Sequence, residues 1–238
     1  TIDYAEYDRI VSLYTKDYGR IRGIAKGAKR SQKRFGGTLE PFTHNEVTFI
    51  DKETQGLNRL ERCRLLTAFP ELAHDIRKVT CGTYFLELVN LLTPEKEKNA
   101  EIFTMLLFFI GLLRQHSFRE ELMRIFELRL FTLLGYQPQL QTCTACGSPF
   151  SIKAQYGFSI KRGGLVCGPC IGQQTELMAL SNGTIKIMQQ AQSITLEKVS
   201  RIRFSEAAHT ECKNVLKNFL EYHIGKKPKS LAVLEQLR

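Results

Sequence analysis

Two pairs of cysteines constrain the fold of this 238-residue chain more than any other feature. Cys143 and Cys146 are separated by two residues, Cys167 and Cys170 are separated in the same way, and twenty residues lie between the pairs. Two intervening residues form a tight turn that directs both sulfurs at one ion, and the glycines and proline beside these cysteines permit such turns. The spacing therefore predicts one structural Zn²⁺ per chain, held by four thiolates with no coordination position left for catalysis. The alternative is four reduced cysteines without a metal.

The composition is that of a globular protein, with 43% hydrophobic and 24% charged residues. No signal peptide is evident at the start, and the longest apolar run, Ile102 to Leu113, is too short to span a bilayer. We therefore expect a cytoplasmic protein. In that reducing compartment closely paired cysteines hold metal more often than disulfides, and the unpaired Cys63, Cys81 and Cys212 are expected to be core thiols.

The hydrophobic period changes along the chain from that of strands to that of helices. Four short stretches of the first domain, residues 1–72, alternate between apolar and polar residues: RIVSLYT, RIRGIAK, EVTFI and, more weakly, LNRLERCRLL. A helical period follows in the second domain, residues 73–238, with a zinc ribbon at 141–172 whose two strands come from KAQYGFSIKRGG. The predicted fold class is α+β, a small β-barrel packed on a helical domain.

Several residues predict where the helices begin and end. We expect one helix to start at Thr93-Pro94 and the next to start with a capping box formed by Ser117 and Glu120. Gly135 is suited to the position just past the end of that second helix. A last helix is expected to end at Gly225.

The net charge of +10 is concentrated in part of the chain. Between Lys16 and Arg34, eight basic residues stand against one acid, Asp17, and aromatic residues lie among them. Cations that follow a phosphate backbone and rings that stack on bases are the components of a sequence-tolerant single-strand binder. The predicted DNA-binding residues are Lys16, Tyr18, Arg20, Arg22, Lys26, Lys29, Arg30, Lys33, Arg34 and Phe35. The alternative is a solvated charged face.

No pattern in the sequence indicates catalysis. The five histidines have neither the spacing of a metal site nor a paired carboxylate nearby, and GRIRGIAKG matches neither a phosphate-binding loop nor a dinucleotide-binding fingerprint. We therefore predict no catalytic residues and no enzyme activity.

Three stretches of the chain resemble the RecO family of bacterial DNA repair proteins. They are AEYDRIVSLYTKDYGRIRGIAKGAKRSQKRFGGTLEPF, FELRLFTLLGYQPQLQTCTACG and GKKPKSLAVLEQL, and together the resemblance covers essentially the whole chain. Family members usually have one more strand before the segment that matches DYAEYDRIV, so the first barrel strand is expected to be missing from this sequence.

The resemblance implies an N-terminal OB-fold, a helical domain with an embedded zinc ribbon, and no covalent chemistry. Such proteins bind single- and double-stranded DNA, anneal complementary strands, and with RecR help load RecA onto DNA coated by single-strand-binding protein. Some family members lack the cysteines, which implies an architectural zinc. The resemblance also implies a nucleoid-associated protein of the bacterial cytoplasm.

The resemblance further implies that the acidic, apolar tail of single-strand-binding protein docks on the helical domain. Arg124 and Arg129 lie among apolar residues and are candidates for the cationic rim of such a pocket. Alternatively, they face solvent or pair with neighbouring glutamates on an amphipathic core helix. A zinc-ribbon RNA-binding or transcription-associated factor is the alternative for the whole chain.

Overall fold

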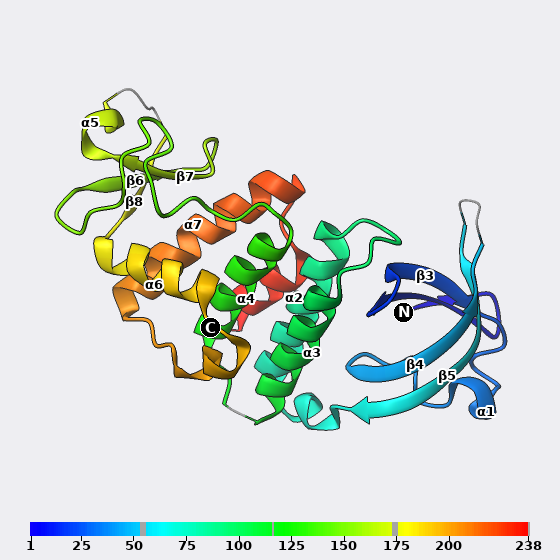
Figure 1. The fold of residues 1–238 in the computed structure, drawn as a ribbon. Helices are drawn as coiled ribbons and strands as arrows, with labels where there is room; N and C mark the ends of the chain where they lie inside the picture. The colour runs from blue at the N-terminus through cyan, green and yellow to red at the C-terminus, as the bar shows by residue number, and fades with distance from the viewer. Residues whose placement is uncertain (53–55, 116, 173–175, 238) are drawn as a thin grey trace. The chain divides into compact units, whose positions relative to one another are not determined.

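The computed structural model describes residues 1–52, 56–115, 117–172 and 176–237 (Figure 1). The chain divides into two compact units, Thr1–Ser117 with the C-terminal end of the chain, and Phe118–Gln236. We refer to them as unit 1 and unit 2. Unit 1 contains the expected strands of residues 1–72 and also three helices, of which the first is short. No helix in the described ranges is long and apolar enough to cross a membrane.

Unit 1 begins with a five-stranded sheet of order β1-β2-β3-β5-β4. All neighbouring strands are antiparallel except β3 and β5, which run parallel where Gly23 lies opposite Asn58. The four predicted strands are all present, and β5, expected to be the weakest, has eleven residues. A short strand, β1, precedes them and pairs with β2. The strands are β1 (Ile2–Tyr4), β2 (Asp8–Thr15), β3 (Gly19–Ala25), β4 (Thr43–Ile50) and β5 (Asn58–Ala68).

The concave side of this sheet encloses a small hydrophobic core. In β3, Ile21, Gly23 and Ala25 are buried while Arg22 is exposed, as expected for a strand with one buried face. Gly23 has to be small, because a Cβ atom there would lie 2.8 Å from Cδ2 of Leu60. The buried members of the core are Val11, Ala25, Phe35, Leu39, Leu60 and Cys63, and Phe35 comes from the short helix α1 (Gln32–Phe35).

Two helices complete unit 1 after the 3₁₀ turn Pro70–His74. Helix α2 (Ile76–Leu92) is capped by Asp75, whose carboxylate accepts hydrogen bonds from the amides of Arg77 and Lys78. Helix α3 (Ala100–Gln115) does not start at Thr93-Pro94 as predicted. Thr93 ends α2 instead, and the side chain of Asn99 accepts the first amide hydrogen bonds of α3.

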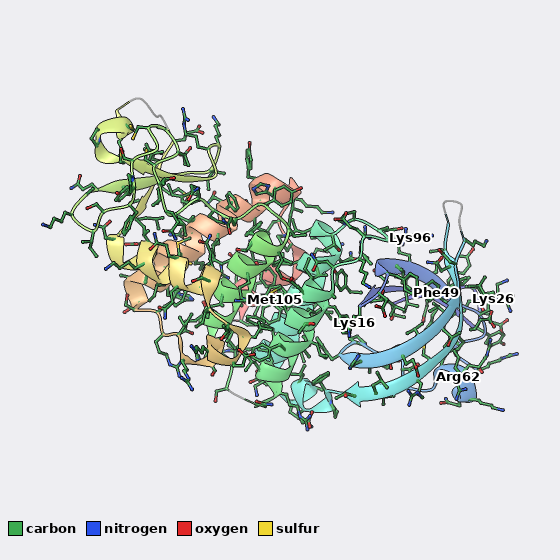
Figure 2. The ribbon with its side chains drawn as sticks, in the orientation of Figure 1. Lys16, Lys26, Phe49, Arg62, Lys96 and Met105 are labelled. Atoms are coloured by element: carbon green, nitrogen blue, oxygen red, sulfur yellow. The ribbon has the colours of Figure 1, made fainter. Side chains whose placement is uncertain are left out.

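The loop between α2 and α3, residues 93–99, lies against the five-stranded sheet, and we call it the strap. The guanidinium of Arg20 donates to the carbonyl oxygen of Thr93 at 2.9 Å and pairs with Glu95 at 3.3 Å. The amide of Lys96 donates to the carbonyl oxygen of Arg20 at 2.8 Å, and its ammonium pairs with Asp51 at 2.6 Å (Figure 2). The strap therefore ties β3 and the end of β4 to the two helices.

Unit 2 contains a three-stranded sheet and a group of helices. The sheet has the order β7-β6-β8, with strands β6 (Tyr156–Ser159), β7 (Gly164–Cys167) and β8 (Met178–Leu180). Of the two strands predicted from KAQYGFSIKRGG, the first is confirmed as β6, whereas β7 begins only at the last residue of that stretch, Gly164. The helices are α4 (Glu120–Leu133), α5 (Gly168–Ile171), α6 (Asn182–Ser193), the 3₁₀ turn Leu196–Arg201, α7 (Glu206–Ile224) and α8 (Lys229–Gln236).

The ends of α4 and α7 test the expected caps. The capping box of Ser117 and Glu120 is wrong, because α4 begins at Glu120 and Arg119 occupies the N-cap position without a side-chain cap. The Arg119 guanidinium instead donates to the carbonyl oxygens of Ser200 and Ile202 at the end of the 3₁₀ turn. Gly135, with a φ of +78°, follows α4 as predicted.

Gly225, with a φ of +72°, ends α7 as predicted, although α8 follows it. Cys63, Cys81 and Cys212 are buried, as expected.

The close contact between Gly19 and the strap predicts that a larger residue at position 19 destabilises the protein. Gly19 has a φ of +62°, and a Cβ atom there would lie 1.9 Å from the carbonyl oxygen of Glu97. Gly19→Ala should therefore lower the free energy of unfolding by about 2–4 kcal/mol, since it adds a steric collision to the cost of a left-handed backbone. Gly37→Ala is the matched control, because Gly37 has a φ of +67° and open space around it, and it should cost only about 1 kcal/mol. If urea unfolding showed equal losses of free energy of unfolding for Gly19→Ala and Gly37→Ala, the close contact between Gly19 and the strap would be contradicted.

Candidate metal centre and nucleic-acid interface

The structure brings the four predicted metal ligands together. Their sulfur atoms all lie within 4.8 Å of one another. Cys143 and Cys146 form a turn in which the amide of Gly147 donates to the carbonyl oxygen of Cys143 at 2.9 Å. The β6–β7 hairpin carries Cys167 at its end, and the first turn of α5 brings Cys170 back to the same point.

The distances fit a tetrahedral metal ion. A Zn–S bond of about 2.3 Å gives a tetrahedron whose sulfur atoms are about 3.8 Å apart. The sulfurs of Cys146 and Cys167 are 3.6 Å apart, close to that value and far longer than a disulfide bond. Backbone amides of Ala145 and Cys167 point at the sulfur of Cys143 at 3.4 and 3.3 Å, which suits a thiolate. These four cysteines could therefore hold one metal ion.

The protonation of the thiols makes metal binding dependent on pH. The hydroxyl and the amide of Ser148 lower the pKa of Cys146 to about 6, so this thiol is ionised at neutral pH. Hydrogen bonds with Cys167 and Cys146 raise the pKa of Cys170 to about 12, because they favour the protonated thiol over the thiolate. A bound divalent cation instead stabilises the thiolate and displaces its proton. Metal affinity should therefore fall as the pH is lowered.

A cysteine substitution tests the metal centre. Cys146→Ser should reduce the zinc content of protein purified under reducing conditions from one ion per chain to well below one, and should lower the melting temperature, since metal binding contributes to folding. Elemental analysis and thermal unfolding measure both effects. Cys63→Ala is the control, because Cys63 lies in the core of the sheet and should leave the zinc content unchanged. An unmodified protein without metal would overturn the assignment.

The predicted DNA-binding residues of unit 1 fall into two groups. Members of the first group are exposed, and their side chains have no ionic partner in the described part of the chain. Lys16 lies in the β2–β3 turn, and Lys26 directly follows β3 (Figure 2). Arg22 lies on the outer face of β3, and Lys33 belongs to α1. These four residues are Lys16, Arg22, Lys26 and Lys33, and their charges are available to a ligand.

The second group is engaged within the protein. The Arg20 side chain holds the strap, as described above. Lys29 pairs with Asp3 at 3.1 Å, and the Arg30 guanidinium lies 3.2 Å from the centre of the Tyr7 ring. Arg34 donates to the backbone carbonyl oxygen of Lys26 at 2.7 Å and to the hydroxyl of Ser31 at 3.1 Å. These cations have internal contacts that a phosphate would have to replace.

The two predicted aromatic residues differ in the same way. Tyr18 is 54% exposed, and its ring packs edge-on against Phe49 with the centroids 5.2 Å apart. Phe35 is only 3% exposed in the core of the sheet, so the prediction that its ring is available to bases is wrong. The apolar residue of a short amphipathic helix belongs to the core, and α1 was not expected from the sequence.

Strand β5 carries cations that were missed in the sequence. Arg59, Arg62 and Arg64 are exposed on its outer face. Arg59 pairs with Glu61 at 2.7 Å and Arg64 with Glu46 at 2.6 Å, whereas Arg62 has no ionic partner in the ranges described (Figure 2). The parallel pairing of β3 with β5 places this strand beside the basic stretch. The alternation of arginines with buried Leu60 and Cys63 could have indicated the exposed face of the strand. The pairing of β5 with β3 could not be predicted from the local sequence.

The predicted partner-binding residues of unit 2 do not form a surface rim. Arg124 is 2% exposed and pairs within α4 with the equally buried Glu127 at 3.0 Å. The guanidinium of Arg129 donates to the carbonyl oxygen of Ile194. The prediction that these two arginines are the cationic rim of a docking pocket is therefore wrong, and the expected alternative of pairing at helical spacing is correct for Arg124.

Removing one partner of the buried Arg124–Glu127 pair should have a large effect on stability. Arg124→Ala should lower the free energy of unfolding by about 3–5 kcal/mol, because the carboxylate of Glu127 stays buried without this partner. Lys161→Ala removes an exposed ion pair with Glu176 and should change the free energy of unfolding by less than about 1 kcal/mol. Similar small losses for both variants in urea unfolding would contradict the buried position of Arg124.

Comparison with known proteins relates this arrangement to a family. The model of the Recombination protein O N-terminal domain matches residues 1–69, and that of the C-terminal domain matches residues 73–232. The DNA repair protein RecO of Syntrophus aciditrophicus (strain SB) is 35% identical over 240 residues, covering 100% of this chain and 93% of the relative. The protein of the same name from Syntrophobacter fumaroxidans is 33% identical over 236 residues, covering 99% and 94%.

A third relative, the DNA repair protein RecO of Pelobacter propionicus, is 30% identical over 237 residues, covering 100% of this chain and 93% of the relative. The matches extend through both the basic strands and the cysteine cluster. They place the chain among recombination mediators of DNA repair rather than among enzymes. The chain belongs to the RecO family of DNA repair proteins.

Proposed function

We propose that the chain binds DNA through unit 1, anneals complementary strands and, together with RecR, helps load RecA onto DNA coated by single-strand-binding protein. The observation that carries the DNA-binding part is the set of exposed cations without ionic partners in the described ranges, namely Lys16, Arg22, Lys26, Lys33 and Arg62. The family to which the chain belongs supports the rest. The family also gives no support to the alternative of an RNA-binding or transcription-associated factor.

The sheet supports the proposal that unit 1 is an OB-type barrel. Its order, with β3 next to β5 and parallel to it, is that of a five-stranded Greek-key barrel. Such barrels bind oligonucleotides on strands 2 and 3. In this chain the strap occupies part of that face through Arg20, so we propose that the strand follows Arg22, the segment after β3 and Arg62.

The proposed mechanism is electrostatic and involves no covalent step. Each phosphate that meets one of the cations releases condensed counterions, which favours binding without regard to sequence. Neutralising the backbones of two complementary strands also lowers their mutual repulsion, so that base pairs can form between them. The residues fit a structural Zn²⁺ at the cysteine cluster, where the ion would hold the ribbon together and leave no open coordination position.

The salt dependence of DNA binding tests the interface. A triple variant, Arg22→Ala, Lys26→Ala and Lys33→Ala, should reduce the slope of log K against log salt by about 2 for single-stranded DNA, since each phosphate contact contributes about 0.7. Arg64→Ala is the matched control on the same sheet, because its guanidinium already pairs with Glu46. A triple variant with an unchanged slope and affinity would move the interface away from these residues.

An annealing assay tests the proposed role as a mediator. Complementary strands coated with single-strand-binding protein should anneal faster when the protein is added, and so should naked strands. Acceleration of naked strands alone would indicate a general nucleic-acid binder and would contradict the mediator role.

A further inference from the structure

Unit 2 carries a cluster of aromatic rings around His223, near the end of α7. The His223 ring lies 4.5 Å from that of Phe219, 5.1 Å from that of Tyr136 and 5.5 Å from that of Tyr222, measured between centroids. Phe219 is buried, but Tyr136 and Tyr222 are 51% and 58% exposed. Two exposed tyrosine rings therefore pack against one histidine.

Two helix ends fix these rings in place. After α4, the amide of Tyr136 donates to the carbonyl oxygen of Phe131 at 2.9 Å and that of Gly135 donates to Thr132 at 3.2 Å, the pattern of a Schellman motif. Tyr222 belongs to the last turn of α7, which is closed by the amide of Gly225 donating to Glu221 at 2.8 Å. These bonds fix the backbone from which the two rings project, and a tyrosine side chain has only two χ angles to restrict when a ligand packs on it.

An exposed cation follows the helix that carries Tyr222. Lys226 directly follows the end of α7, is exposed and has no ionic partner among the residues described. The turn between β6 and β7 also lies close to the cluster, because a Cβ atom on Gly163 would lie 3.9 Å from Cε2 of Phe219. Arg162 on this turn is exposed, but its guanidinium donates to the carbonyl oxygen of Thr144 at 3.4 Å, so it is not counted among the available cations. Desolvation lowers the pKa of His223, which favours the uncharged form of its ring.

The geometry points to a second contact surface for single-stranded nucleic acid on unit 2, with bases stacked on Tyr136 and Tyr222 and a phosphate at Lys226. Exposed rings beside cations are the combination that binds unpaired strands with little sequence preference. A duplex hides the faces of its bases, so this surface should prefer single strands. The inference rests on the proposed function and adds to it a site whose contribution comes from stacking rather than from charge alone.

Tryptophan fluorescence tests this surface directly, because the chain contains no tryptophan. Tyr222→Trp introduces a single tryptophan at the proposed stacking position. Single-stranded oligothymidylate should quench its emission over the same concentration range in which the full-length protein binds the strand, and a duplex of the same length should quench it less. Ile152→Trp is the matched control, since Ile152 is 52% exposed elsewhere in unit 2 and its emission should not change.

A second variant separates stacking from charge. The double variant Tyr136→Ala, Tyr222→Ala should weaken binding of single-stranded oligothymidylate about tenfold and leave the salt slope unchanged, because stacked bases release no counterions. Zinc content and thermal unfolding show whether this variant keeps its fold.

The outcomes distinguish this inference from the proposed function. Binding of the strand by the full-length protein without quenching in the Tyr222→Trp variant and without loss in the double variant overturns the inference and leaves the DNA-binding proposal standing. Absence of any strand binding overturns both. Quenching by a short acidic, apolar peptide but not by the oligonucleotide would identify a protein-docking surface and also overturn the inference.

Discussion

The contact of Arg20 with the strap is the interaction on which unit 1 depends. One guanidinium joins strand β3 to the end of α2 through Thr93 and Glu95, and Lys96 connects the same loop to Asp51, just after β4. Gly19 permits this close approach because it has no Cβ atom. As a result, the sheet and the two helices form one compact unit, although the period of the sequence changes between them.

The same contact decides which cations are available for DNA. A cation that already has a carboxylate or carbonyl partner must give up that contact to bind a phosphate, which reduces the net gain in binding free energy. A solvated cation has no such contact to lose, and its binding to a phosphate is favoured by the entropy of the counterions released from the DNA. By this criterion Arg20 contributes to the fold, while Arg22, two residues further along the same strand, faces solvent. The proposed interface is therefore smaller within the basic stretch than the composition implies, and it extends to Arg62 on β5.

How far the sequence predicts the structure depends on how local each feature is. The cysteine cluster was predictable because two short turns and one hairpin bring the sulfurs together, and the four strands were predictable from their alternation. Phe35 and Arg124 were misjudged because their burial depends on residues distant in sequence or on tertiary packing, which periodicity does not reveal. The capping box failed for the same reason, since Arg119 binds carbonyl groups about eighty residues later.

The central claim is that DNA lies along the unpaired cations of unit 1, and amide hydrogen exchange of the full-length protein with and without single-stranded DNA tests it most directly. The account predicts increased protection in residues 22–34 and around Arg62, with exchange in the strap unchanged because Arg20 keeps its partners. Protection of the strap together with no change in residues 22–34 would contradict the account.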